Sequence, residues 1–249
     1  MEKESAKSRN ETSPSPAEPF FIKMPNAPLI SSADAMRIEK ELLDRLKSRG
    51  PRGSTLKPLA IFYSRVGQQE TAYRHLKTWM KHTKNSEELA ECLLMCGQLA
   101  EQVDQPKSAI AFYHEGLQVG ATDPQVNYYL HNNLGYCLGN EAEYEQAQHH
   151  CEAAIQLDAT RSNAYKNLGL CHQGLGRYGE AAAAWIKALH ADASDPRPLE
   201  LLEKLLVHQS AVLERDIPDI HRKLDACRHA LATAKTGRFA DWARGLTLN

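Results

Sequence analysis

Apolar residues recur at helical spacing from residue 31 onward, and Gly, Pro or polar turns interrupt them at regular intervals. The first segment begins at Ser31, with Asp34 as its capping partner, and ends before Gly50. Its apolar stripe consists of Ile38, Leu42, Leu43 and Leu46. The pattern predicts one amphipathic helix at about 32–48, within an N-terminal segment at 29–52.

One short phrase occurs twice, as NNLGYCLGNEAEYEQA at residues 132–147 and as KNLGLCHQGLGRYGEA at residues 166–181. Its Gly, Cys, Tyr and Ala keep the same places, and the equivalent glycines, Gly135 and Gly169, are 34 residues apart. A fixed period of about 20 to 50 residues is typical of stacked-repeat proteins. The chain is therefore predicted to consist of repeated units, each packed on the next.

Each unit is predicted to be a hairpin of two helices. In the last one, helical patterns at 163–174 and 178–190 are joined by a turn in which Gly174 and Gly176 suit the left-handed conformation at a helix end. A small residue twelve positions before a second small residue anchors each unit, and this position is held by Ala60, Gly97, Gly135 and Gly169. The predicted units are 53–86, 90–123, 128–161 and 162–195.

The last unit resembles the tetratricopeptide repeat (TPR) family, whose pattern of large, Leu-Gly, aromatic and Ala positions is met by Tyr165, Leu168, Gly169, Gly176, Tyr178, Ala181, Trp185 and Ala188. The unit at 128–161 matches well, the unit at 90–123 has Ala100 where the family has an aromatic residue, and 53–86 is a degenerate TPR-like hairpin. The resemblance implies an all-α fold, a right-handed superhelical solenoid of TPR helix hairpins with an N-terminal helix and a C-terminal capping helix.

The two ends of the chain differ from the repeats. Residues 1–28 are rich in Pro, Ser and charge, which predicts a disordered tail. Residues 196–249 are predicted to form terminal helices that cap the array. Within 217–234 there is an apolar stripe of Ile217, Ile220, Leu224, Cys227 and Leu231, which suits a capping helix or, alternatively, a helix for self-association.

Composition narrows the function. The chain has 30 Lys and Arg against 31 Asp and Glu, a net charge of −1, so a nucleic-acid partner is not expected. The first residues contain no apolar run for a signal peptide or membrane insertion, so the protein is predicted to be soluble and cytoplasmic. Six cysteines without a CxxC pair are predicted to be buried thiols in a reducing compartment.

No catalytic motif is present, and we expect no enzyme activity, metal or cofactor. His149, His150 and Cys151 are the densest potential ligands, but consecutive helix residues point about 100° apart and cannot share one metal ion. Cys92 and Cys96 share a helix face but lack two further ligands. Both sets are predicted to be core or solvated positions.

The resemblance implies a peptide-binding groove lined by the first helix of each hairpin. In this family the residue two before the conserved Gly faces the groove, and Asn there can bind a peptide backbone; here these residues are Asn133 and Asn167. The alternative is that they cap or solvate the helix. Neighbouring positions predicted to line the groove are Glu91, Gln98, Glu101, Tyr129, Asn132, Tyr136, Asn140, Asn163, Lys166, Leu170, Gln173, Arg197 and Lys204.

These positions run from acidic to basic, which predicts a ligand with a basic end near Glu91 and Glu101 and an acidic end near Lys166, Arg197 and Lys204. Tyr129 and Tyr136 are the candidates for apolar contact with it, although each could instead serve repeat packing. The chain is thus predicted to be a non-catalytic adaptor or scaffold that binds a peptide or helix of another protein. The alternative is a chaperone or assembly factor that shields a client protein before secretion or complex assembly.

Overall fold

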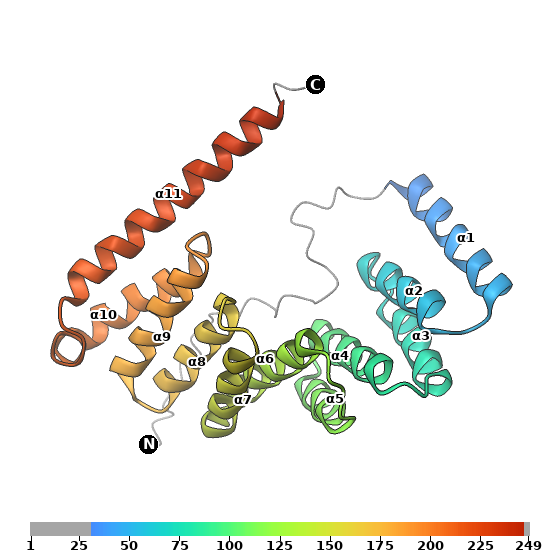
Figure 1. The fold of residues 1–249 in the computed structure, drawn as a ribbon, viewed down its shortest axis with the longest axis horizontal. Coiled ribbons are helices and arrows are strands. Elements are labelled where there is room, and N and C mark those ends of the chain that lie inside the picture. Colours follow the sequence, from blue (N-terminus) through green and yellow to red (C-terminus); the bar gives the residue numbers. More distant parts are fainter. Residues whose placement is uncertain (1–30, 247–249) are drawn as a thin grey trace, which may run out of the picture.

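The structure is a computed structural model that describes residues 31–246, and within this range it contains eleven α-helices and no strand (Figure 1). The all-α solenoid predicted from the sequence is confirmed. Figure 1 shows the helices following one another in chain order along a curved stack, with α1 at one end and α11 at the other. The tail predicted at 1–28 lies outside the described residues.

Four helical hairpins form the body of the stack. The first lies within 53–86 and the last within 162–195, whereas the second begins at Ser86 and the third at Pro124, each four residues before its predicted bound of 90 or 128. The hairpins are α2 (Gly53–Arg65) with α3 (Gln69–His82), α4 (Ser86–Gln102) with α5 (Pro106–Gln118), α6 (Pro124–Asn140) with α7 (Tyr144–Leu157), and α8 (Ser162–Gly174) with α9 (Tyr178–Ala191). They are flanked by α1 (Ser32–Arg49), α10 (Arg197–Asp216) and α11 (Ile220–Leu246).

A side-chain cap starts α1 at the residue where the sequence predicts a start. The Ser31 hydroxyl accepts a hydrogen bond from the Asp34 amide at 3.1 Å, which confirms the capping pair. At the end of α8 only Gly176 is left-handed, with φ of 73°. Gly174, predicted to share that conformation, is instead helical, and a Cβ there would lie 2.4 Å from the Tyr144 ring. Its small size serves close packing.

Glycine and alanine mark the places where helices of one hairpin touch. A Cβ on Gly97 would lie 2.2 Å from the Tyr113 ring, and one on Gly135 would lie 2.7 Å from the Cys151 sulfur. The alanines that follow each anchor by twelve residues are all buried: Ala72, Ala109, Ala147 and Ala181. The repeated phrase therefore records repeated close contacts between helices.

Replacing Ala181 with leucine should destabilise the protein by about 1 to 3 kcal/mol, because the site is fully buried and the longer side chain must displace neighbours. Urea unfolding followed by circular dichroism measures the loss. Ala183→Leu is a matched control, since Ala183 lies on the same helix and is exposed. An unchanged midpoint for Ala181→Leu would contradict the packing shown.

The C-terminal stripe is covered by the protein's own helices. Ile217, Ile220, Leu224, Cys227 and Leu231 are all buried, and they form one apolar cluster with residues of α9 and α10 such as Trp185 and Leu202. Helix α10 departs from helical geometry at Gln209, where φ is −134°. The apolar stripe that could have supported self-association is thus engaged inside the chain, in the arrangement of a capping helix.

Candidate functional site

A cavity of about 290 Å³ lies between α6, the start of α7 and α8. Five residues that the sequence places in the groove line it: Tyr136, Asn140, Asn167, Leu170 and Gln173. Asn140 and Gln173 are exposed, whereas Tyr136 and Leu170 are half-buried. The cavity therefore combines an apolar wall with amide groups at its edge, an arrangement typical of sites that hold one side chain of a ligand.

A second cavity, of about 220 Å³, lies beside α8 and the loops that precede α8 and α10. The predicted residues Tyr129, Asn163 and Arg197 line it, together with Arg161, which the sequence reasoning missed. The Arg161 guanidinium lies over the Tyr129 ring at 5.0 Å, and its Nη1 donates to the Tyr129 hydroxyl at 2.5 Å. The sequence signal that could have identified Arg161 is its place as a basic residue directly before a predicted helix of the repeat.

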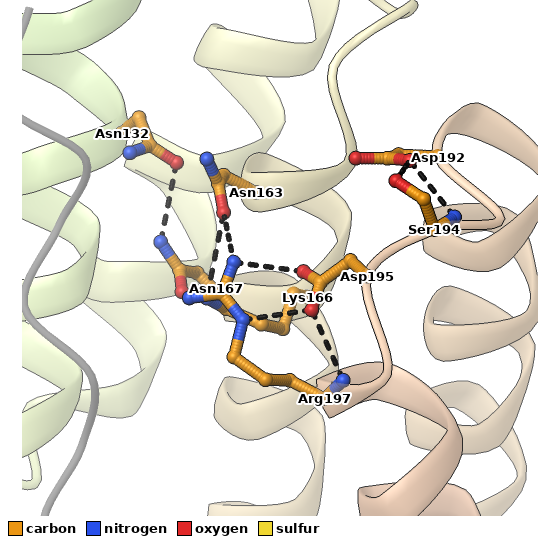
Figure 2. A network of polar contacts seen from close by, with 8 residues as sticks. All are labelled: Asn132, Asn163, Lys166, Asn167, Asp192, Ser194, Asp195 and Arg197. Atoms are coloured by element: carbon orange, nitrogen blue, oxygen red, sulfur yellow. Dashed lines mark hydrogen bonds and ion pairs between the residues drawn. The ribbon is translucent and has the colours of Figure 1, made fainter. Parts of the chain in front are cut away.

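Several residues that line the second cavity belong to a network of polar contacts (Figure 2). Arg197 donates from both Nε and Nη2 to the two oxygens of Asp195 at 2.8 Å, and Nη2 also reaches Asn163 at 3.4 Å. Burial raises the pKa of the Asp195 carboxyl, but the hydrogen bonds from Arg197 outweigh burial and hold that pKa below its usual value. Lys166, 8% exposed, donates to the same Asn163 oxygen at 3.4 Å.

The predicted asparagines form part of a buried chain of hydrogen bonds. Asn167 donates to Asn132 at 3.1 Å, Asn132 donates to Asn133 at 3.0 Å, and Asn133 reaches the Tyr113 hydroxyl at 3.5 Å. Asn133 is 0% exposed. Asn132 and Asn133 therefore bind protein groups in three successive hairpins, while Asn167 also borders the first cavity with an oxygen that has no partner among the described residues.

The chain of hydrogen bonds ends on an acid. The Tyr113 hydroxyl donates to Glu101, and burial raises the pKa of that carboxyl to about 7 although the Tyr113 hydrogen bond lowers it. Glu91 forms an ion pair with Lys57 at 2.6 Å. Of the two acids predicted to attract a basic ligand end, Glu101 is thus partly protonated and Glu91 is ion-paired. The negative charge at this end of the predicted groove is therefore smaller than the sequence suggests.

The remaining predicted positions lie apart from the two cavities. Gln98 is buried, and its amide nitrogen has no partner among the described residues. Lys204 is exposed on α10.

All six cysteines are buried free thiols, as predicted. In the part of the chain that the structure covers, no helix is long and apolar enough to cross a membrane.

Comparisons with known proteins support the repeat assignment. No family model matches the chain. The chain is 28% identical over 112 residues to heat shock protein STI1 of Saccharomyces cerevisiae, a match that covers 45% of this chain and 18% of STI1. It therefore spans less than a fifth of that relative's length.

Two solved structures share the fold. MamA from Desulfovibrio magneticus RS-1 has a TM-score of 0.57 at 20% identity, covering 73% of this chain and 96% of MamA. YrrB, described as a TPR protein with an unusual peptide-binding site, has a TM-score of 0.54 at 16% identity, covering 69% of this chain and 84% of YrrB. At these identities the likeness concerns the fold alone.

Proposed function

We propose that this chain, which has the fold of tetratricopeptide repeat solenoids, is a non-catalytic adaptor that binds a peptide or helix of a partner protein in the groove formed by α6 and α8. The observation that carries the proposal is the cavity lined by Tyr136, Leu170, Asn140 and Gln173. A buried aromatic or aliphatic contact supplies most of the binding energy in such sites, whereas each net hydrogen bond adds about 1 kcal/mol. The amides then orient the peptide backbone.

The second cavity supplies the preference for charge. Arg161 and Arg197 both line it; Arg161 pairs with Asp158 at 2.6 Å and Arg197 with Asp195 at 2.8 Å, so a ligand carboxylate would share these guanidinium groups with the two aspartates. Asn163, which also borders the cavity, lies one turn of α8 before Asn167 in the first cavity. One turn corresponds to about 5.4 Å, so neighbouring residues of one ligand can reach both sites. The ligand we propose therefore carries an aromatic or aliphatic side chain for the first cavity and a carboxylate for the second.

The fold comparison with YrrB supports a peptide ligand, since that protein is described by its peptide-binding site. The partial match to a heat shock protein favours the second candidate function, a chaperone or assembly factor. The two functions differ in what happens to the partner. Loss of a client protein in cells lacking this chain would favour the chaperone role, whereas stable but mislocated or unassembled partners would favour the adaptor role.

Peptide binding should fall about tenfold or more, equivalent to about 1.4 kcal/mol, when Tyr136 or Leu170 is replaced by alanine, because the apolar wall of the first cavity is lost. An array of immobilised peptides of varied sequence, probed with the full chain, identifies a peptide that binds. Fluorescence anisotropy of that peptide, labelled and free in solution, then measures its affinity for each variant. Leu157→Ala is the control, since Leu157 is 40% exposed on α7 and lines neither cavity.

Two results would contradict the proposal. One is the absence of any peptide that binds the wild-type chain, and the other is equal binding by the cavity variants and the control. Exchanging the terminal charges of a bound peptide without loss of affinity would remove the charge preference assigned to Arg161 and Arg197 while leaving the first cavity as the site.

A further inference from the structure

A third cavity, of about 450 Å³, lies between α3, α4 and the first half of α5. Cys96, Leu99 and Ala100 of α4 line it and are buried. Tyr73 on α3 and Phe112 on α5 also line it; both are half-buried, and their rings meet edge to face with centroids 6.2 Å apart. None of these residues lines the two cavities described above. The third cavity is therefore a largely apolar site of its own, separate from the groove of α6 and α8.

The cavity exists because one hairpin lacks an aromatic side chain that its neighbour has. Three residues after the anchoring small residue, the hairpin α2–α3 has Tyr63 and the hairpin α4–α5 has Ala100. The Tyr63 ring stacks on His75 of α3 with centroids 5.3 Å apart, and its hydroxyl donates to Glu39 of α1 at 2.6 Å. Phe112 holds the place in α5 that His75 holds in α3. Ala100 thus leaves open beside Phe112 the space that Tyr63 fills beside His75.

The chain itself carries aromatic residues for this space, just before α1. Phe20, Phe21 and Ile22 stand together in the sequence and are followed by Lys23. They lie outside the described residues, which begin at residue 31. A phenylalanine ring offers the large apolar area that an apolar cavity binds best. Glu70, an exposed acid that lines the cavity, is a partner of opposite charge for Lys23.

The segment is long enough to reach the cavity. Helices α1 and α3 both pack on α2 and are joined to it by turns of three residues, so the starts of α1 and α3 lie at the same end of the stack. The cavity is at this end as well, because its α3 residues, Gln69, Glu70 and Tyr73, belong to the first two turns of that helix. With packed helices about 8 to 10 Å apart, the start of α3 is roughly 20 Å from the start of α1. Phe21 precedes Ser31 by ten positions, which an extended chain spans with about 33 Å.

We propose that residues 20–22 dock in the third cavity of the same molecule, with a phenylalanine ring beside Phe112 in the place that Tyr63 occupies beside His75. The tether favours this occupant, since a short linker gives an effective concentration in the millimolar range. A partner protein that uses this surface therefore has to displace the segment. The contact is independent of the peptide groove between α6 and α8.

The test measures binding of a fluorescein-labelled peptide of residues 16–30 to the full chain by fluorescence anisotropy. In the wild type the chain's own segment competes with the peptide, whereas the double variant Phe20→Ala/Phe21→Ala leaves the cavity open. With an effective concentration of about 1 mM and a peptide dissociation constant of about 0.1 mM, the double variant should bind the peptide about tenfold more tightly than the wild type.

A second substitution in the double variant locates the peptide. Val103 lines the cavity and is 41% exposed, so Val103→Glu is compatible with folding but puts a charge into the apolar site. It should weaken peptide binding about tenfold or more. Val207→Glu is the matched control, because Val207 is 79% exposed on α10 and lines none of the three cavities. Circular dichroism establishes that each variant is folded.

Four results would overturn the proposal. The peptide binds neither the wild type nor the double variant, it binds both equally, or it binds the Val103→Glu chain as tightly as the Val207→Glu chain. The fourth is a wild-type dimer in light scattering that Phe20→Ala/Phe21→Ala converts to a monomer, because the segment would then occupy the cavity of a second copy. A monomeric wild type with the expected order of affinities supports docking within one chain.

Discussion

Replacing Gly169 with alanine is expected to destabilise the protein by about 3 kcal/mol, at the upper end of overpacking effects. A Cβ at this position would lie 2.2 Å from Nε1 and 2.5 Å from Cδ1 of Trp185. Trp185 is 0% exposed, and its Nε1 donates to the Lys166 carbonyl at 3.1 Å. The methyl group therefore displaces a large side chain that is packed on all sides and weakens its hydrogen bond. Urea unfolding followed by circular dichroism measures the change.

Gly139→Ala is the matched control. A Cβ on Gly139 would meet only the Ala147 Cβ and the Cys171 sulfur, both at 3.8 Å, which is ordinary contact. Because glycine inside a helix costs roughly 0.5 to 1 kcal/mol relative to alanine, Gly139→Ala should stabilise the protein slightly. The same substitution is thus expected to have opposite signs at two helical glycines. Equal effects at both would show that the Gly169–Trp185 contact does not decide the packing.

The fold was predictable from the sequence because its determinants are local and repeated. Gly135 and Gly169 recur at a fixed period since every hairpin needs the same close approach, and the capping pair at Ser31 and Asp34 acts within one turn. The sequence did not show which glycine at the end of α8 is left-handed. Gly174 and Gly176 are both candidates, and only the contact of Gly174 with Tyr144 separates their roles.

The site was predicted only in part, because its chemistry depends on contacts between repeats. The repeat register predicts that Tyr136 and Leu170 line the groove, and the structure has both side chains at the first cavity. It does not reveal that Asn133 is fully buried and that Asn132 bridges it to Asn167. Nor does it pair His131 with His150, nineteen residues apart on different helices. Such side-chain directions are set by the superhelix as a whole.

Glu101, the buried acid at the end of the hydrogen-bonded chain from Asn167 through Asn132, Asn133 and Tyr113, should make the stability of the protein depend on pH. Burial raises the pKa of Glu101 to about 7 in the folded protein, whereas its ordinary value is 4.5. Between these values the folded state binds more protons than the unfolded state, so this group's contribution to stability is present below about pH 4.5 and is lost as pH rises through 7. The loss amounts to about 3 kcal/mol at 1.36 kcal/mol per pKa unit.

Histidines oppose this trend in an overlapping range. The pKa values of His131 and His150 are lowered, that of His150 to about 4, so these groups add stability as pH rises toward about 6.5. Wild-type stability alone therefore mixes two opposite effects. The informative quantity is the difference in unfolding free energy between the wild type and Glu101→Gln, because the histidines are common to both proteins.

Glu101→Gln keeps the shape of the side chain and an oxygen that accepts the Tyr113 hydroxyl, but removes the titration. The wild type should lose about 2.5 kcal/mol relative to this variant between pH 5 and pH 8, because part of the loss is already complete at pH 5; urea unfolding at unit steps of pH measures it. Glu145→Gln, an exposed acid on α7, should show no such change relative to the wild type. If the difference in unfolding free energy between the wild type and Glu101→Gln does not change with pH, the Glu101 carboxyl is ionised in the folded protein over this whole range. Water would then reach that carboxyl.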